Sequence, residues 1–379
     1  MVSVALVRQK YTASGGAERF VSRALQALQH HQQLQVHLIA RKWQKLEGIT
    51  AHKIDPFYMG SLWRDWSFAR AARAFWTNQS FDLIQSHEWI AGAHIYRAGD
   101  GVHAQWLALR CQQGGMKRKI AQFFNPYHHY VKRAEKMMFT HPELKKVICN
   151  SLMVKKEIQD YFNLPDDKFS IIYNGVNHQE FSPDLKQHRQ AVRATLGIDN
   201  NTPVLLFVGS GFARKGLALA LNATKPHNAI ELIIIGKDKH CAHYQQLAQQ
   251  LGIANRCHFL GAQNDVKPYL GAADGFILPT LYDPFPNACV EALASGLPVL
   301  TSTTCGTAEL IKEGKNGFTA SALDIDAWSE IVSSWLTLWQ HDSQALTEQA
   351  SNSVQHLTLE NMSQQMNELY QNLLENKRQ

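Results

Sequence analysis

The sequence predicts an α/β protein built from two doubly wound, Rossmann-like domains that face a central cleft. Short apolar runs typical of buried strands alternate with helical segments, and this alternation begins a second time near residue 200. A chain of 379 residues also exceeds one ordinary core, so two domains of about 150–200 residues are expected. Sheets of this kind bind ligands at the carboxyl ends of their strands, and the cleft between two such domains is the expected site.

The first series of elements is expected to form an N-terminal domain over residues 1–185. Ser151 can cap one of its helices. A polar stretch that contains Pro183 is predicted to be the linker to the next domain. The strands are predicted at residues 2–7, 34–40, 81–87, 146–149 and 169–173, and the helices at 17–30 and 152–162.

The second series is expected to form a C-terminal domain over residues 186–358. Its strands are predicted at 203–208, 230–235, 257–260, 275–278 and 297–301, and its helices from 216 onward and at 243–251 and 287–294. The tail, 359–379, is polar but carries Met362, Met366 and Leu369 on one face of a predicted amphipathic helix.

Composition narrows the class of protein. With 45% hydrophobic and 18% charged residues and no low-complexity tract, the chain resembles an ordinary soluble globular protein. Its six cysteines show no C-x-x-C motif or paired spacing, which favours reduced thiols in a cytoplasmic protein and predicts no metal site. The N-terminus lacks the features of a signal peptide, and no apolar run approaches the length of a membrane span.

The stretch 279–299 is the strongest candidate for a ligand site. A buried strand, a turn with three prolines and a helix from Asn287 follow one another, and a helix start after a strand suits an anion. Asp283 and Glu291 lie on either side of this helix start. Carboxylates there can accept hydrogen bonds from sugar hydroxyls while backbone amides bind a phosphate. Asp283 as a simple helix cap and Glu291 as a surface residue are the alternatives.

A glycine-rich loop follows the first predicted strand of the second domain and places Arg214 and Lys215 at a helix start. Two cations there oppose the helix dipole unless an anion compensates them, so the loop is predicted to bind a diphosphate without a metal ion. Lys237, after the next strand, is either a third contact or an ordinary loop charge. Gly15 and Gly16, after the first strand of the chain, either bring backbone amides to the same diphosphate or form only a turn.

Asp100 and His103 lie on a glycine-flanked loop of the first domain. A carboxylate and an imidazole three residues apart suit hydrogen bonding to an acceptor hydroxyl. An Asp-Gly pair can also be only a turn. We therefore treat the two side chains as candidate catalytic residues on the acceptor side.

Residues 103–146 carry nine Lys or Arg and two Glu, an excess larger than the net charge of +6 of the whole chain. Large apolar side chains are interleaved with the charges: Trp106, Leu107, Leu109, Phe123, Phe124, Tyr127 and Tyr130. Basic residues with exposed aromatic rings suit an anionic membrane surface, whereas no nucleic-acid-binding motif is present. Solvated helices with buried aromatic rings are the alternative.

Together these stretches resemble the retaining glycosyltransferases of family 4, which have the GT-B fold. The resemblance covers nearly the whole chain, and its most specific part is the pair Asp283-x7-Glu291. Within the family, the loop around Arg214 and the stretch 98–100 look most like bacterial lipopolysaccharide core glucosyltransferases. The resemblance also implies that the helix at 359–379 packs back onto the first domain.

With this resemblance the candidate residues fall into two sets. The donor-binding set consists of loop and helix-start residues: Gly15, Gly16, Arg214, Lys215, Lys237, Asp283, Phe285, Asn287, Ala288 and Glu291. The catalytic set consists of Asp100, His103 and Asp283. Asp283 stands where the family usually has Glu, and its shorter side chain is expected to affect the choice of donor sugar more than the activity.

The resemblance implies a retaining, metal-independent glycosyltransferase without a cofactor. It would move a hexose, glucose from UDP-glucose first, onto a lipid-linked lipopolysaccharide core, and would lie on the cytoplasmic face of the inner membrane through residues 103–146, with no nucleic-acid partner. Another family 4 transferase, acting on a capsule, O-antigen or glycolipid acceptor, is the main alternative. A sugar-nucleotide epimerase of the same fold and a non-catalytic sugar-nucleotide-binding protein are further alternatives, and neither would need a membrane-bound acceptor.

Overall fold

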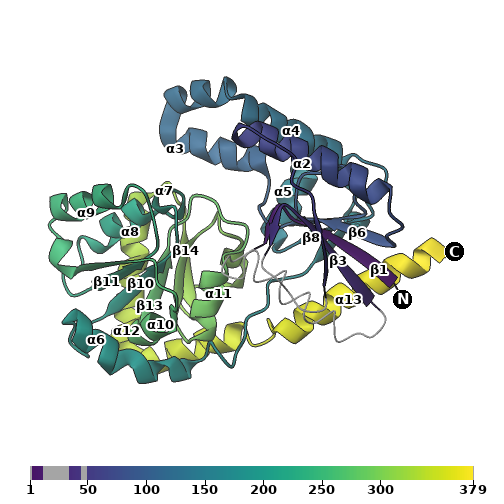
Figure 1. Ribbon diagram of the computed structural model, residues 1–379. Helices are drawn as coiled ribbons and strands as arrows, with labels where there is room; N and C mark the ends of the chain where they lie inside the picture. The colour runs from purple at the N-terminus through teal and green to yellow at the C-terminus, as the bar shows by residue number, and fades with distance from the viewer. Residues whose placement is uncertain (1, 12–33, 44–48, 379) are drawn as a thin grey trace. The chain divides into compact units, whose positions relative to one another are not determined.

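The computed structural model of the chain describes residues 2–11, 34–43 and 49–378 (Figure 1). The chain divides into two compact units, one formed by residues 1–175 with 359–379 and the other by residues 176–358. Each unit contains one parallel sheet flanked by helices. The predicted class, two doubly wound α/β domains, is therefore confirmed.

Seven parallel strands form the sheet of the first unit, in the order β5-β3-β1-β6-β7-β8-β9. Their bounds are β1 Val2–Val7, β3 Leu34–Ala40, β5 Thr50–Lys53, β6 Leu83–Ser86, β7 Ile95–Ala98, β8 Lys146–Cys149 and β9 Phe169–Ile171. A separate parallel ladder pairs β2 (Lys10–Tyr11) with β4 (Lys42–Trp43). Each predicted strand of this domain has its counterpart in the sheet, whereas the helix predicted at 17–30 lies outside the described residues.

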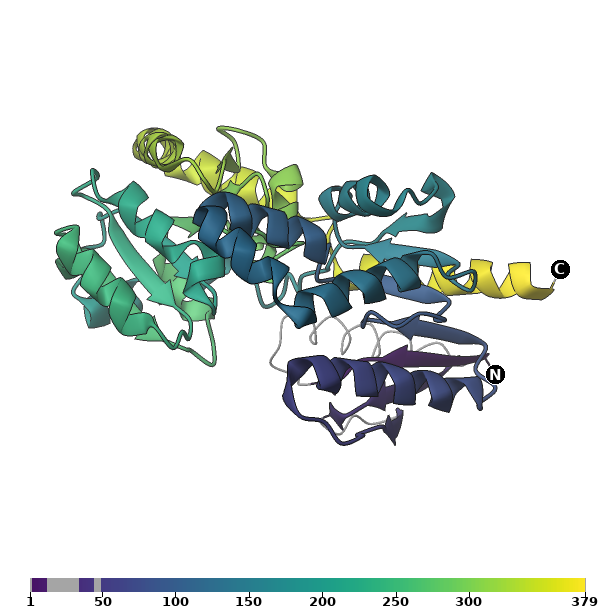
Figure 2. The same cartoon turned by 90° about the horizontal axis from the view of Figure 1, so that it is seen from above.

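Helices cover both faces of this sheet. They are α2 Gly60–Thr77, α3 His103–Phe123, α4 Pro126–Phe139, α5 Leu152–Phe162 and α13 Leu359–Arg378. Successive residues of a strand point to opposite faces, and β1 follows this rule. Val4 and Leu6 belong to the core that contains Met366 of α13, and Ala5 and Val7 to the core on the α2 side. Figure 2 shows α13, in yellow, running along the sheet of the first unit.

Six parallel strands form the sheet of the second unit, in the order β12-β11-β10-β13-β14-β15. The strands are β10 Val204–Val208, β11 Glu231–Ile235, β12 Cys257–Gly261, β13 Gly275–Leu278, β14 Val299–Ser302 and β15 Gly317–Ala320. The helices are α6 Arg189–Leu196, α7 Phe212–Lys215, α8 Leu217–Thr224, α9 Cys241–Gln250, α10 Lys267–Ala272, α11 Asn287–Ala294 and α12 Ile325–Ser353. The predicted strands of this domain are all present.

The boundary between the units lies after Gly175, whereas the sequence placed it after residue 185. The supposed linker is part of the second unit, because the 3₁₀ helix Pro183–His188 packs closely on α10. At the closest point, a Cβ on Gly271 would lie 1.8 Å from the carbonyl oxygen of Leu185. A polar segment with a proline thus forms a packed element and not a free connection.

In both sheets the strand order reverses at one place, between β1 and β6 in the first unit and between β10 and β13 in the second. Open α/β sheets bind their ligands at the carboxyl ends of the strands at such a switch point. The loops that leave these four strands are therefore where functional side chains are expected.

Candidate active site

Two loops of opposite charge meet at the switch point of the second unit. The loop after β10 leads into α7, which ends with Arg214 and Lys215, and the loop after β13 contains Asp283. Lys215 Nζ donates to Asp283 Oδ2, and Arg214 Nη1 donates to the same oxygen at 3.1 Å. The structure thus brings together three of the predicted residues in one cluster, which we call the donor cluster.

Backbone contacts fix the two loops against each other. Leu281 N donates to the carbonyl oxygen of Arg214 at 2.8 Å. Gly216 follows α7 with a φ of +78°, and a Cβ there would lie 1.9 Å from the carbonyl oxygen of Pro279. Because only glycine fits this backbone conformation and this close approach, the position of the donor cluster is set by the fold as well as by its charges.

The donor cluster is largely buried and carries more positive than negative charge. The side chains of Lys215 and Asp283 are each 11% exposed, and that of Arg214 is 43% exposed. Burial alone would raise the pKa of the Asp283 carboxyl, but the charges of Lys215 and Arg214 outweigh it and hold the pKa below its usual value. Asp283 is therefore ionised at neutral pH, and two cations share one carboxylate. The surplus positive charge suits a bound anion.

The loop after β11 lies beside the glycine-rich loop. Gly211 N donates to the carbonyl oxygen of Lys237 at 3.3 Å, and Lys237 N donates to Ser210 Oγ at 3.2 Å. The side chain of Lys237 is exposed. Phe212 N, the first amide of α7, donates to Asp238 Oδ2 at 2.7 Å. The sequence does not predict that Asp238 accepts this hydrogen bond.

The other predicted donor-binding residues continue along the chain from Asp283. Phe285 lies in the turn before α11, and Asn287 and Ala288 are the first residues of that helix. Glu291 lies about one turn further along α11 and is only 6% exposed, so it is not a surface residue. These residues share one loop–helix junction with the donor cluster.

Asp100 and His103 have separate partners in the first unit. Asp100 Oδ2 lies 3.7 Å from Nη1 of Arg8, and its side chain is 57% exposed. Arg8 Nε also lies 3.9 Å from Glu88 Oε1, so one guanidinium forms ion pairs with two carboxylates. Asp100 is thus held at the carboxyl edge of the sheet next to the loop that leaves β1.

His103 is the first residue of α3 and lies among other rings. Its Nε2 is 3.1 Å from Nδ1 of His128 on α4, and its ring packs edge-on against Trp89. Burial, followed by the charge of His128 and of neighbouring cations, lowers the pKa of His103 to about 4. The imidazole is therefore neutral at pH 7, which suits hydrogen bonding to a hydroxyl.

Glu135 holds the start of α3 from a neighbouring helix. It is 1% exposed on α4, and its Oε1 accepts a hydrogen bond of 2.8 Å from the backbone N–H of His103. Its Oε2 is buried without a hydrogen-bond partner in the described part of the chain. Burial raises the pKa of Glu135 to about 8, although the bond from His103 opposes this shift.

The sequence does not predict Arg8, His128 or Glu135 as site residues. Arg8 directly follows the first strand. Because ligands bind at the carboxyl ends of such strands, this position is the feature from which Arg8 could have been predicted as a site residue. His128 and Glu135 come from another helix, and no local pattern connects them with α3. The predicted donor-binding residues Gly15 and Gly16 lie outside the described residues.

Three further features bear on the class of protein. Among residues 2–11, 34–43 and 49–378, no three His, Cys, Asp or Glu side chains are grouped so as to hold a metal ion. None of the helices described here is long and apolar enough to cross a membrane. The six cysteines are free thiols.

Family models and relatives in sequence identify the chain. The model of "Glycosyltransferase Family 4" matches residues 14–180, and that of "Glycosyl transferases group 1" matches residues 188–353. An uncharacterised glycosyltransferase of Methanocaldococcus jannaschii is 30% identical over 274 residues, which are 67% of this chain and 67% of that protein. The lipopolysaccharide glucosyltransferase WaaG of Escherichia coli is 28% identical over 243 residues, which are 62% of this chain and 63% of that enzyme. The matched region thus spans about two thirds or less of these relatives.

Solved structures agree on the fold. The crystal structure of WaaG, a glycosyltransferase involved in lipopolysaccharide biosynthesis, matches with a TM-score of 0.81 at 22% identity and covers 96% of this chain and 98% of that one. Anabaena HepE in complex with UDP-glucose matches with a TM-score of 0.75 at 18% identity and covers 98% and 100%. The predicted GT-B fold is confirmed by these matches. The chain belongs to glycosyltransferase family 4 and is a glycosyltransferase.

Proposed function

We propose that the protein is a retaining, metal-independent glycosyltransferase that moves a hexose from a nucleotide diphosphate sugar, UDP-glucose first, to a lipopolysaccharide core acceptor. The observation that carries this proposal is the donor cluster, in which two cations share one buried carboxylate at a switch point. The name of WaaG, a lipopolysaccharide glucosyltransferase, and the UDP-glucose bound to HepE support the choice of substrates.

The donor cluster has the chemistry that a departing diphosphate requires. Negative charge grows on the diphosphate as its bond to the sugar breaks, and preorganised cations in a buried site stabilise such charge better than cations in water. Lys215 is preorganised, because its stem packs against Gly209, where a Cβ would lie 3.1 Å from Lys215 Cγ. Both cations bind Oδ2 of Asp283, which leaves Oδ1 for a hydroxyl of the donor sugar.

Retention of configuration follows if both substrates react on one face of the sugar. The acceptor oxygen forms its bond to the anomeric carbon as the bond to the phosphate breaks, and the acceptor proton passes to the departing phosphate oxygen. No protein base is then required, and Asp100 and His103 would orient the acceptor hydroxyl. The amides of Phe285, Asn287 and Ala288 and the carboxylate of Glu291 would complete the donor site.

A panel of donors tests this function. UDP-glucose, UDP-galactose, UDP-N-acetylglucosamine, GDP-mannose and ADP-heptose are each incubated with truncated lipopolysaccharide core, and the products are identified by mass and by the configuration of the new bond. We expect transfer of one hexose with retention, and the same rate in the presence of EDTA. Loss of activity on chelation, restored by a divalent cation, would contradict metal independence.

Other outcomes of the panel point to the alternatives. Transfer to a capsule, O-antigen or glycolipid acceptor but not to the core would replace the acceptor in this proposal and leave the reaction class intact. Isomerisation of the free donor without any acceptor would indicate an epimerase.

We also propose that α3 and α4, which lie side by side in Figure 1, place the enzyme on an anionic membrane. Of the apolar side chains in this segment, Leu107 and Leu109 are buried, whereas Phe123 and Phe124 at the end of α3 are 66% and 75% exposed. Exposed Lys and Arg side chains on the same two helices supply the attraction to acidic lipids: Lys119, Lys132, Arg133 and Lys136.

Vesicle flotation is expected to show this binding. The protein should float with vesicles that contain acidic phospholipid and not with neutral ones, and the double variant Phe123→Ser/Phe124→Ser should bind about tenfold more weakly, because two apolar side chains no longer enter the interface. Ile325→Ser, which changes a 56% exposed side chain of the second unit, is the matched control. Equal binding to neutral and acidic vesicles would exclude an electrostatic surface.

A further inference from the structure

The ring of His103 is held by a second histidine from a neighbouring helix. His128 Nδ1 lies 3.1 Å from His103 Nε2, and the two ring centroids are 5.1 Å apart. The other ring nitrogen of His103, Nδ1, makes no hydrogen bond with any residue that the structure describes, and it is not a fully buried atom. One nitrogen of His103 is therefore bound within the protein, and a ligand can reach the other.

His128 is fixed in the first turn of α4. Asn125 caps this helix, since its Oδ1 accepts from Tyr127 N at 3.0 Å and its carbonyl oxygen accepts from His128 N at 3.1 Å. The Tyr127 hydroxyl donates to Asp65 Oδ2 at 2.9 Å and so ties the start of α4 to α2. His128 itself is only 8% exposed. Its Nδ1 is therefore in place before a substrate arrives.

Neighbouring rings keep His103 in this orientation. Between ring centroids, Trp106 lies 5.4 Å from His103 and 6.0 Å from His128, and Trp89 packs on His103 at 6.1 Å. Glu135 holds the backbone N–H of His103. A flip of the imidazole, which would exchange its two nitrogens, would require these rings to move. The fold thus favours the contact through Nε2.

Both imidazoles are uncharged at neutral pH. Burial, followed by the charges of His128, Lys132 and Arg110, lowers the pKa of His103 to about 4. Burial, followed by the charges of Arg110, Lys132 and His129, also lowers the pKa of His128. A neutral imidazole has one N–H donor and one acceptor nitrogen, so one ring donates to the other. The direction of this single hydrogen bond decides the tautomers of both rings.

Two effects favour donation by His103. If His103 donates, each ring carries its proton on Nε2; if His128 donates, each ring carries its proton on Nδ1. The Nε2–H form is the more stable tautomer of a neutral histidine side chain. His103 is also the first residue of α3, where the helix dipole favours a lone pair over an N–H at Nδ1, the ring nitrogen nearer the backbone. Both effects leave Nδ1 of His103 as an acceptor.

We propose that His128 is a positioning residue, which holds His103 as its Nε2–H tautomer and so leaves Nδ1 to accept a hydrogen bond from a hydroxyl of the acceptor. The inference rests on the proposed transfer to a sugar acceptor. With its proton on Nδ1, His103 could not accept this bond. The low pKa of His103 makes it a weak base, so the bond orients the hydroxyl and takes no proton from it.

Nitrogen NMR of the full-length protein, with its 18 histidines labelled with ¹⁵N, reads the tautomer directly. The variant His103→Gln identifies the signals of His103 by their loss. We expect His103 to carry its proton on Nε2 at neutral pH and to show an Nδ1 signal typical of an unprotonated nitrogen. A wild-type His103 that is protonated on Nδ1 would overturn the proposal, whatever the variants show.

Two variants separate the hydrogen bond of His128 from its bulk. His128→Phe keeps a ring but has no acceptor, so His103 should become a mixture of tautomers. The kcat/KM for the acceptor should fall about three- to tenfold, the net worth of one hydrogen bond, and the KM for the donor should not change. His128→Asn should keep the tautomer and the kcat/KM of the wild type, because its Oδ1 can accept the bond in place of Nδ1.

His141→Phe is the control for the aromatic substitution. His141 lies just after α4 in the same unit, where its Nδ1 accepts from Glu143 N. This variant should leave the tautomer of His103 and the kcat/KM unchanged. A His128→Phe protein that keeps the Nε2–H tautomer and the normal kcat/KM would contradict the positioning role, as would equal losses in the Phe and Asn variants of His128.

The outcome is separable from that of the proposed function. If the donor panel yields no transfer but the tautomer of His103 responds to the His128 variants as expected, the hydrogen bond stands as described and the proposed reaction fails. If transfer proceeds while His128→Phe changes the tautomer of His103 but not the kcat/KM, the reaction stands and His128 does not position the acceptor.

Discussion

Replacing Lys215 by alanine is expected to lower kcat for sugar transfer by about 10²–10³-fold, the usual effect of removing one preorganised group that stabilises charge in a transition state. The Lys215 side chain is 11% exposed and its ammonium is held by Asp283, so water cannot substitute for it easily. Arg214 remains in the variant and still neutralises the carboxylate, which is why the fold should survive. Initial rates with saturating donor and acceptor measure the effect.

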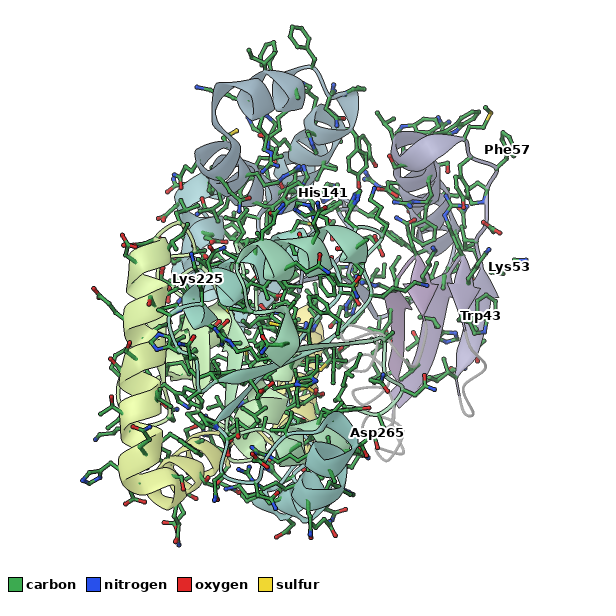
Figure 3. The ribbon with its side chains drawn as sticks, turned by 90° about the vertical axis from the view of Figure 1, so that its left-hand side faces the viewer. Trp43, Lys53, Phe57, His141, Lys225 and Asp265 are labelled. Atoms are coloured by element: carbon green, nitrogen blue, oxygen red, sulfur yellow. The ribbon has the colours of Figure 1, made fainter. Side chains whose placement is uncertain are left out.

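The control for this variant is Lys225→Ala, which removes an exposed lysine at the end of α8 in the same unit (Figure 3). Its kcat should equal that of the wild type. Asp283→Asn provides a second test, because it keeps the volume of the side chain and removes the charge that holds Lys215. Normal turnover in both Lys215→Ala and Asp283→Asn would remove the donor cluster from the mechanism.

Glu135→Gln is expected to stabilise the protein at alkaline pH. The pKa of Glu135 rises from 4.5 to about 8 on folding, so the folded protein binds this proton more tightly than the unfolded chain. Its contribution to the free energy of unfolding is therefore complete below pH 4.5 and is lost as the pH rises through 8. At about 1.4 kcal/mol per unit of pKa, the loss is on the order of 5 kcal/mol.

The glutamine variant separates this titration from other groups. Its amide oxygen can still accept the bond from His103 N, but the side chain has no proton to lose, so its free energy of unfolding should fall less between pH 5 and pH 8.5 than that of the wild type. His103 has a pKa of about 4 and is neutral over this range. Urea unfolding at several pH values measures the difference. Glu143→Gln, at a 54% exposed side chain, is the control, and parallel pH curves for wild type and Glu135→Gln would refute the assignment.

The fold could be predicted largely because its strands are short apolar runs buried on both faces. Two long helices that the sequence does not predict, α2 and α12, give weaker signals. Helix α2 begins after Met59, which provides no side-chain cap, and α12 is interrupted by the non-helical conformation of Asp342. Helix α2 therefore lacks a start signal, whereas α12 has one in Asp324, whose side chain accepts a hydrogen bond from Ala327 N, but is broken in its middle. Their positions are determined by packing on the sheets.

The candidate residues of the two units differ in the same way. Arg214, Lys215 and Asp283 lie in the segments that follow the neighbouring strands β10 and β13, so parallel topology brings them to one edge of a sheet. The contact between Glu135 and His103 instead joins residues 32 positions apart on two different helices, α4 and α3. Such contacts depend on how helices pack, which no local pattern encodes. The role of Glu135 therefore becomes visible only in the folded chain.

The chain passes from the first unit to the second after residue 175 and returns after residue 358. These two junctions indicate where a chimera with another family member should be joined. Val176 N donates to the carbonyl oxygen of Leu357 at 2.9 Å, and Val176 pairs with Thr358, so the second unit begins and ends at one point. The second unit is therefore an insertion in the sequence of the first unit, which continues at residue 359. A donor specificity from another family member should be transferred by exchanging residues 176–358 at both junctions together. A fusion at a single junction would instead replace α13, and with it Met366 and Tyr370 from the core of the first unit.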